Sequence, residues 1–568
     1  MMKRYIYLAS ALLMFAVCES AYAQELDPTV VVNRTYEGQL VDVNKPSFNM
    51  MVPDSVTRFD LDFDYTVFEK PYRGSYEFNP YLLKMQPSSA AQKLRQLYLR
   101  AGVGYTLHPT LDVVWSPTFK GPFRMDVYGL HRSYFGPYRN IEVTDDFKLD
   151  RVAGADGKYS YWKGYDSYTR GGVDGSYDWD RAVFEFDASY LGIIANEDQR
   201  KTRHFDGLEV KVGVSSKTDM DSTYVYDVCL GYTFGVDNLN FAGSRQALNE
   251  HVFDLTGQVG RTLTRKHQLM FDFGFKLASC SALEPSSLLT QIYLAPHYVL
   301  KKSRWSVDAG VRLDLLVAKE QLSDIYPTSG QFLYPDVKAW FDVIPEAMRL
   351  YAAIGGGNRL DTYVSTLKEN HHFDPSYSLD NWPLMDVEVE RVSASAGLAG
   401  RVSSILSYDV RAGYVNYKNA RLDAVAVVDG KCLPGFGYSG YQKFYAAMDL
   451  HVKTESVRFD GNVEYTLPWA AEFPSLIMPS PLKGNAVAEY NWKRRVFAGV
   501  DCDFALARKS ADYTVPAYAD LGVYAEVAAN GCISFWLRGG NLLNMTIQRN
   551  LLYAEKGINF TAGICLNL

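Results

Sequence analysis

The feature that most constrains this chain is a two-residue alternation of apolar side chains, clearest in residues 557–568. The apolar positions there are Ile558, Phe560, Ala562, Ile564, Leu566 and Leu568. Successive side chains of a β-strand point to opposite faces, so this stretch predicts a strand with one apolar and one polar face.

The same period recurs from about residue 95 onward. Clear examples are residues 182–190, 208–214, 305–315, 406–414 and 444–452. Alternation over about ten residues is typical of a half-buried strand. No run of about 18 apolar residues follows the N-terminal segment, so a membrane location would require strands rather than helices. A closed sheet with lipid outside and water inside satisfies this pattern.

The connections between the predicted strands alternate between short and long. Short turns are predicted near residues 120, 178–181, 264–266, 301–303, 344–347, 403–404, 453–456, 492–494 and 530–531. Longer loops are predicted at 134–166, 236–250, 278–288, 318–330, 357–388, 418–440, 468–482 and 540–554. Outer-membrane barrels combine tight periplasmic turns with long extracellular loops. We therefore predict an all-β fold: a transmembrane antiparallel β-barrel of about 22 strands over residues 96–568.

Composition fits this interpretation. A chain of 568 residues would ordinarily suggest several domains, but a large barrel can absorb the whole length. The 41 tyrosines suit a membrane–water boundary, where an apolar ring and a wet hydroxyl are both satisfied. A formal charge of -7, without a sustained basic stripe, argues against nucleic acid as a partner.

The N-terminus is typical of a signal peptide. Lys3 and Arg4 precede an apolar run over residues 5–17, and an Ala-Tyr-Ala sequence ends at Ala23. We predict a signal peptide over residues 1–23. Lipidation of Cys18 is the alternative, but Val17 stands where a small residue is expected. The other six cysteines form no C-x-x-C pair, so neither a disulfide framework nor a zinc site is predicted.

Residues 24–95 differ in composition from the rest and are predicted to form a periplasmic or lumenal segment. Asp60, Asp62 and Asp64 alternate there with apolar residues. A calcium loop would also need a turn glycine and a distal glutamate, which are missing. A solvated strand face is the favoured interpretation.

No catalytic or cofactor site is predicted. His371 and His372 lie with Glu369 and Asp374 in a long loop and could contact a metal, but an adjacent pair among nine histidines is weak support, so no metal site is predicted. The segment Gly435–Gly440 fits G-x-G-x-x-G without the βαβ unit that dinucleotide binding requires. Neither G-x-S-x-G nor H-E-x-x-H occurs, so we expect a protein that is not an enzyme.

Two short motifs carry a family resemblance. Residues 538–544 contain Asn541, Leu542, Leu543 and Asn544, followed by a loop and the closing strand. This segment resembles one in the penultimate strand of TonB-dependent outer-membrane receptors, and the tyrosine-rich barrel is similar to Bacteroidota members of that family. A second segment resembles a TonB box, the extended peptide that pairs with a TonB-type periplasmic protein by β-augmentation. Its matching residues are Asp27, Thr29, Val30, Val31 and Val32.

The resemblance implies a location in the cell outer membrane, contact with its lipid, and transport of an unknown solute. One departure matters. Family members carry an N-terminal plug domain, whereas only about 70 residues lie between the predicted cleavage site and the first barrel strand. The alternative is therefore a non-transporting barrel that binds partner proteins through its N-terminal segment and outer loops. A barrel enzyme is a third class, but it lacks an identifiable Ser/His pair.

Overall fold

The structure is a computed structural model. It describes residues 95–153, 156–196, 202–217, 224–238, 247–281, 287–319, 329–345, 347–373, 385–428 and 431–568. The predicted signal peptide, the TonB-box-like residues Asp27 to Val32 and the acidic strand Asp60 to Asp64 lie outside these residues. The described residues all belong to the unit Ser89–Leu568.

Twenty-two strands of this unit form one closed antiparallel sheet. In chain order the wall strands are β1 (Leu97–Tyr105), β2 (Thr110–Trp115), β3 (Phe123–Arg139), β6 (Tyr161–Asp178), β7 (Ala182–Asn196), β8 (Arg203–Ser216), β9 (Tyr224–Asp237), β10 (Leu248–Thr264), β11 (His267–Cys280), β12 (Ser287–Lys301), β13 (Trp305–Lys319), β14 (Gly330–Ile344), β15 (Met348–Asp361), β16 (Asp386–Val402), β17 (Leu406–Val428), β18 (Lys431–Lys453), β19 (Val457–Trp469), β20 (Leu482–Trp492), β21 (Val496–Ala505), β24 (Tyr518–Ala528), β25 (Ile533–Gly540) and β26 (Asn559–Asn567).

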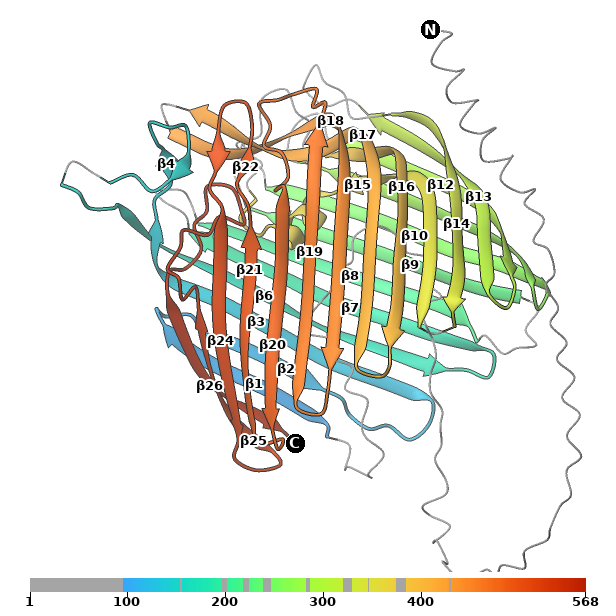
Figure 1. Cartoon of the computed structure of the whole chain (residues 1–568), viewed down its shortest axis with the longest axis horizontal. Helices are drawn as coiled ribbons and strands as arrows, with labels where there is room; N and C mark the ends of the chain where they lie inside the picture. The colour runs from blue at the N-terminus through green and yellow to red at the C-terminus, as the bar shows by residue number, and fades with distance from the viewer. Residues whose placement is uncertain are drawn as a thin grey trace, which may run out of the picture. The chain divides into compact units, whose positions relative to one another are not determined.

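The sheet closes because the last strand pairs with the first. β26 pairs with β25 on one side and with β1 on the other, from Tyr98 opposite Asn567 to Tyr105 opposite Phe560. Every other wall strand pairs with its neighbours in the chain, as the continuous colour change around the wall in Figure 1 illustrates. Closure leaves no unpaired edge, which is the condition for strands to cross a bilayer. The predicted fold class and strand number are confirmed.

The two faces of the wall follow the alternation in the sequence. On β26, Phe560 and Ile564 are 46% and 44% exposed, whereas Thr561 and Cys565 are 6% and 7% exposed. The first pair points outward and the second toward the lumen. Outward apolar side chains recur around the wall, including Leu208, Val311, Leu350, Val410 and Val500. A closed sheet with this apolar outer surface is built to sit in an outer membrane.

The short turns lie at one end of the barrel, together with the end of the closing strand, and the long loops lie at the other, which we call the outer end. One predicted loop is wrong. Residues 418–440 extend β17 and β18 into strands of 23 residues each. Gly435–Gly440 therefore lies within β18. Ala420, Leu422 and Ala424 explain the difference, because they are buried in an apolar cluster with Tyr441 and Leu476, so the two-residue period continues past the membrane.

The outer loops pack against one another. Two small ladders form there, β4 (Glu142–Val143) with β5 (Leu149–Asp150) and β22 (Arg508–Lys509) with β23 (Thr514–Val515). Their apolar residues join those of the last loop in a cluster formed by Ile141, Leu149, Ile477, Val515, Leu551 and Ala554. The outer end therefore has a core of its own.

One helix, α2 (Tyr363–Glu369), follows β15. Among the residues described above, the chain has no helix that is long and apolar enough to cross a bilayer. Tyr363, Val364 and Leu367 pack into the largest apolar cluster, against inward-facing residues of the wall such as Ile193 and Phe205. The helix therefore lies inside the barrel, against the outer part of its wall.

Candidate functional site

The candidate site is the inner surface of the outer end, where the segment Thr362–Phe373 folds against the wall. A capping box starts α2: the Thr362 hydroxyl accepts from the Ser365 N–H at 3.2 Å, and the Thr362 N–H donates to the Ser365 hydroxyl at 3.0 Å. Two orphan N–H groups of a short helix are thereby satisfied. The cap fixes where the chain leaves β15 and turns into the lumen.

Three charged residues of the wall hold this helix. Buried Glu250 of β10 accepts from the backbone N–H groups of Tyr363 and Val364 at 2.6 and 2.7 Å. The Tyr363 hydroxyl donates to Asp237 of β9 at 2.7 Å, and Arg203 of β8 donates to Asp237 at 2.9 Å. Hydrogen bonds with a charged partner are the stronger ones, and these bonds are sheltered from water. The helix is thus fixed to three neighbouring strands.

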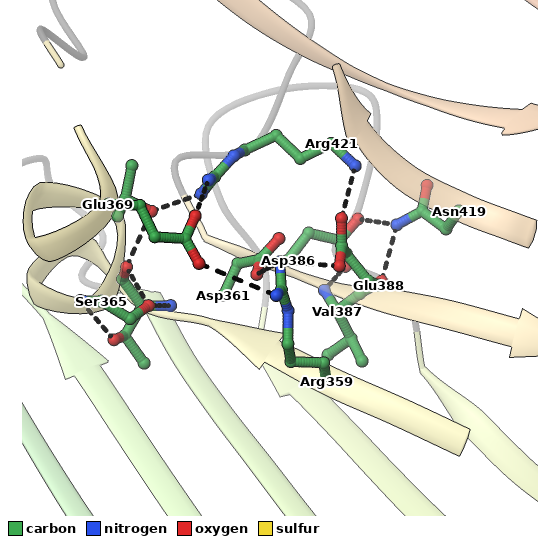
Figure 2. A network of polar contacts seen from close by, with 11 residues as sticks. Arg359, Asp361, Ser365, Glu369, Asp386, Val387, Glu388, Asn419 and Arg421 are labelled. Atoms are coloured by element: carbon green, nitrogen blue, oxygen red, sulfur yellow. Dashed lines mark hydrogen bonds and ion pairs between the residues drawn. The ribbon is translucent and has the colours of Figure 1, made fainter. Parts of the chain in front are cut away.

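The other side of the helix meets the polar network of Figure 2. Arg359 of β15 lies 2.8 Å from Glu388 and 3.3 Å from Asp361, measured between nitrogen and oxygen. Arg421 of β17 donates to Glu369 at the end of α2 at 3.1 Å. Two arginines therefore bridge acidic groups from β15, α2 and β16, and they link the helix to strands on its second flank.

A polar pocket of about 190 Å³ opens between α2 and the wall strands β8 to β11. Its lining includes Lys211, Lys276 and Lys368, with Glu209 and Asp254 among them and several hydroxyl groups. Glu209 pairs with Lys211 at 2.7 Å and also contacts Lys368. The pocket offers both donors and acceptors, so it can hold a small polar group.

The histidines singled out in the sequence lie directly after the helix. His371 Nε2 lies 3.7 Å from Asp166 Oδ2 of β6, and His372 stacks on Tyr553 of the last loop. Glu369 does not join them, because it pairs with Arg421 and Arg359 instead. Asp374 lies outside the described residues. Sequence reasoning missed Asp166, because only the fold brings it beside residues about 200 positions later.

The family-like motif shapes the last loop, residues 541–558. The Asn541 amide donates to the carbonyls of Met545 and Lys556, both at 2.9 Å, and its oxygen accepts from the Met545 N–H at 2.9 Å. Asn544 accepts from Arg139 of β3. Asn541 and Asn544 have φ angles of 47° and 53°, a conformation that asparagine tolerates better than most residues.

The two leucines of the motif differ from the asparagines. Leu543 is exposed, and Leu542 donates its backbone N–H to Leu521 at 2.9 Å. The motif therefore anchors a loop through its asparagines. The likeness of these four residues to the family's penultimate-strand segment stays a prediction.

In the same loop, a single arginine, Arg549, contacts three carboxylates. Arg549 donates to Asp503 at 2.8 Å and to Asp520 at 2.9 Å, and it also contacts Glu555. Burial alone would lower the pKa of Arg549, but Glu555, Asp520 and Asp503 outweigh it and raise that pKa. No sequence motif predicts this group of contacts, because its members come from three separate segments of the chain.

Comparison with known proteins supports the fold. No family model and no curated protein matches the chain. Among solved structures, the FrpB iron transporter from Neisseria meningitidis in its apoprotein form has a TM-score of 0.62 at 9% identity, covering 84% of this chain and 81% of that chain. A mutant ferric enterobactin receptor from Pseudomonas aeruginosa has a TM-score of 0.58 at 11% identity, covering 83% and 80%.

The siderophore receptor PirA from Acinetobacter baumannii has a TM-score of 0.58 at 10% identity and covers 84% of this chain and 80% of its own. At such identities the likeness concerns the fold. The chain therefore has the barrel fold of these iron transporters and siderophore receptors, as the strand alternation and the family resemblance predicted.

Proposed function

We propose that this protein is an outer-membrane receptor that imports a solute, with energy supplied by a TonB-type periplasmic partner. The observation that carries the proposal is the barrel itself: a closed wall of 22 strands whose outer end folds inward around a polar pocket. The similar structures are described as iron transporters and siderophore receptors. A lumen of this size needs closing segments, and an inward helix with a polar lining suits a receptor better than an open pore.

The proposed partner contact is the segment Asp27 to Val32. An extended peptide adds to a sheet edge through its backbone N–H and C=O groups. Proline lacks the N–H, so Val31→Pro should break such pairing. We expect the full chain to bind the purified periplasmic domain of a TonB protein and Val31→Pro to bind it at least tenfold more weakly. Val31→Thr, which keeps the N–H and the β-branched shape, serves as the matched control.

The transport step is tested by conductance in planar bilayers with potassium chloride. We expect the full chain to conduct poorly and a variant lacking residues 24–95 to conduct more. Cells carrying the truncated variant should also become sensitive to vancomycin, which is too large for ordinary porins. If the full chain instead forms a steady open pore, the receptor proposal is wrong. If Val31→Pro and Val31→Thr bind the TonB domain equally well, the proposal that a TonB-type partner supplies the energy is wrong.

The alternative of a scaffold barrel makes a different prediction. A scaffold would show neither TonB binding nor a conductance change on truncation, while still assembling in the outer membrane. The pocket beside α2, whose lining carries charged side chains and hydroxyl groups, favours the receptor over the scaffold, because such a lining can bind a small polar group of a solute.

A further inference from the structure

Three potential metal ligands meet at the outer end of the lumen. Asp166 comes from β6, and His371 and His372 come from the segment after α2. One ligand atom from each, a carboxylate oxygen or an imidazole nitrogen, can be chosen so that all lie within 4.8 Å of one another. Within the part of the chain that the structure describes, no other group of His, Cys, Asp and Glu meets this geometry.

Two of the three side chains, those of Asp166 and His372, are oriented by a neighbour. The Tyr138 hydroxyl donates to Asp166 Oδ1 at 2.5 Å, so Oδ2 is the oxygen turned toward His371. The His372 ring stacks on Tyr553 with centroids 4.6 Å apart and planes 15° apart. Metal ligands are commonly oriented in this way by outer hydrogen bonds and packing.

The backbone of the histidine segment is also fixed. Arg203 of β8 donates to the carbonyl of Phe373 at 2.6 Å and to that of His371 at 3.4 Å. Because Arg203 is itself buried and bonded to Asp237, the two histidines are presented from a rigid support. A preorganised ligand set loses little entropy on binding.

We propose that Asp166, His371 and His372 bind one divalent transition-metal ion of the zinc type, which clamps the segment after α2 to β6. Two imidazole nitrogens and one carboxylate oxygen suit zinc, nickel or copper, whereas calcium and magnesium prefer oxygen ligands alone. Metal–ligand bonds of about 2.0–2.2 Å place tetrahedral ligand atoms roughly 3.3 Å apart. The present separations, at most 4.8 Å, would have to shorten by up to about 1.5 Å through side-chain rotation to reach that spacing.

A tetrahedral site of this type keeps a fourth ligand position, where water or a donor group of a solute can complete the coordination. The clamp would join three parts of the outer end: the wall through Asp166, the helix segment through its histidines, and the last loop through Tyr553 stacked on His372. The site does not depend on which solute the barrel takes, so it can be tested without a known substrate.

The test uses the full chain, purified in detergent without a histidine tag and stripped of metal with a chelator. Zinc is titrated by calorimetry, and cobalt(II) is followed by its visible absorption. We expect one zinc ion per chain with micromolar or tighter affinity. His371→Ala and His372→Ala should each weaken binding at least tenfold, and Asp166→Asn should weaken it less because one oxygen ligand remains.

The control is His451→Ala. His451 Nδ1 lies 2.9 Å from Asp460 Oδ1 in the wall strands β18 and β19, so it is a histidine–carboxylate pair outside the cluster. It should leave zinc affinity unchanged. Heat-dependent gel mobility verifies that every variant is folded. Absence of saturable zinc binding by the folded full chain overturns the proposal, and so does equal binding by the full chain and a folded His371→Ala/His372→Ala variant.

Discussion

The barrel wall and the segments that close its outer end are built by different rules. In the wall, each strand pairs with its neighbours in the chain, and one two-residue period decides which side chain meets lipid. At the outer end, α2 is held by Glu250, Asp237 and Arg203, and the last loop is held by Arg549 and Asn541. The wall is a repeated local solution, whereas the closing segments depend on single long-range contacts.

This difference indicates where function resides. A wall position has many equivalents, so most single changes there alter only assembly. A residue that holds a closing segment in place, such as Glu250 of the wall or Arg549 of the last loop, has no equivalent among the residues described, because it joins segments that are distant in sequence. Changes there should therefore alter the outer end while the barrel still forms.

The largest effect should come from a charge on the lipid face of the wall. Ile564→Arg places a guanidinium near the middle of β26, where a cationic side chain costs roughly 2–4 kcal/mol at the bilayer midplane. We expect a strong loss of the heat-modifiable, assembled form on gels of unboiled samples. Asn485→Arg is the control, since Asn485 pairs with Asp503 in the register of β20 and β21 and faces the lumen. Equal loss in both variants would contradict the assignment of the two faces.

A smaller, local effect should follow from Glu250→Gln. The amide can replace only one of the two charge-assisted bonds to the N–H groups of α2, and it turns a donor toward the other, which costs about 1–3 kcal/mol. Because tenfold corresponds to about 1.4 kcal/mol, we expect hydrogen exchange of residues 363–369 to accelerate roughly 5- to 150-fold. Barrel assembly should be unchanged.

Glu185→Gln is the matched control for this change, because Glu185 is an exposed carboxylate of the lumenal wall. It should leave exchange in residues 363–369 unaltered. Loss of barrel assembly in Glu250→Gln would show that helix and wall fold as one unit, and the proposed division between them would fail.

The same division explains what could be read from the sequence. Closure, strand number and the outward side of β26 follow from the period of Ile558 to Leu568 and its repeats, because strand geometry turns a sequence period directly into faces. Residues 418–440 resemble a loop in the sequence because of the glycines within β18, whereas the inward packing of Leu422 and Ala424 keeps the strands extended.

The sequence alone does not predict the candidate site, for a physical reason. His371 and His372 stand out as an adjacent pair, but Asp166 of β6 reaches them only because the segment after α2 folds against the inside of the barrel wall. In the sequence, Glu250 is one more polar position of an alternating strand. Its neighbouring residues do not predict that it binds the start of a helix more than 100 residues later. Contacts that depend on barrel closure carry no short-range signature.

The smallest effect should come from Arg549→Met, which tests whether the last loop is closed by charge. Methionine keeps much of the apolar stem but removes the contacts to Asp503, Asp520 and Glu555. The site is about one-third exposed, so solvent screens the loss and we expect about 1 kcal/mol of local destabilisation. Hydrogen exchange in residues 541–558 should quicken by about fivefold, since that factor corresponds to roughly 1 kcal/mol. Arg549→Lys keeps the charge without the planar guanidinium, so its exchange rate in residues 541–558 should lie between those of the parent chain and Arg549→Met. If the methionine variant exchanges like the parent chain, the apolar cluster around Leu149 and Leu551 closes the loop without help from charge.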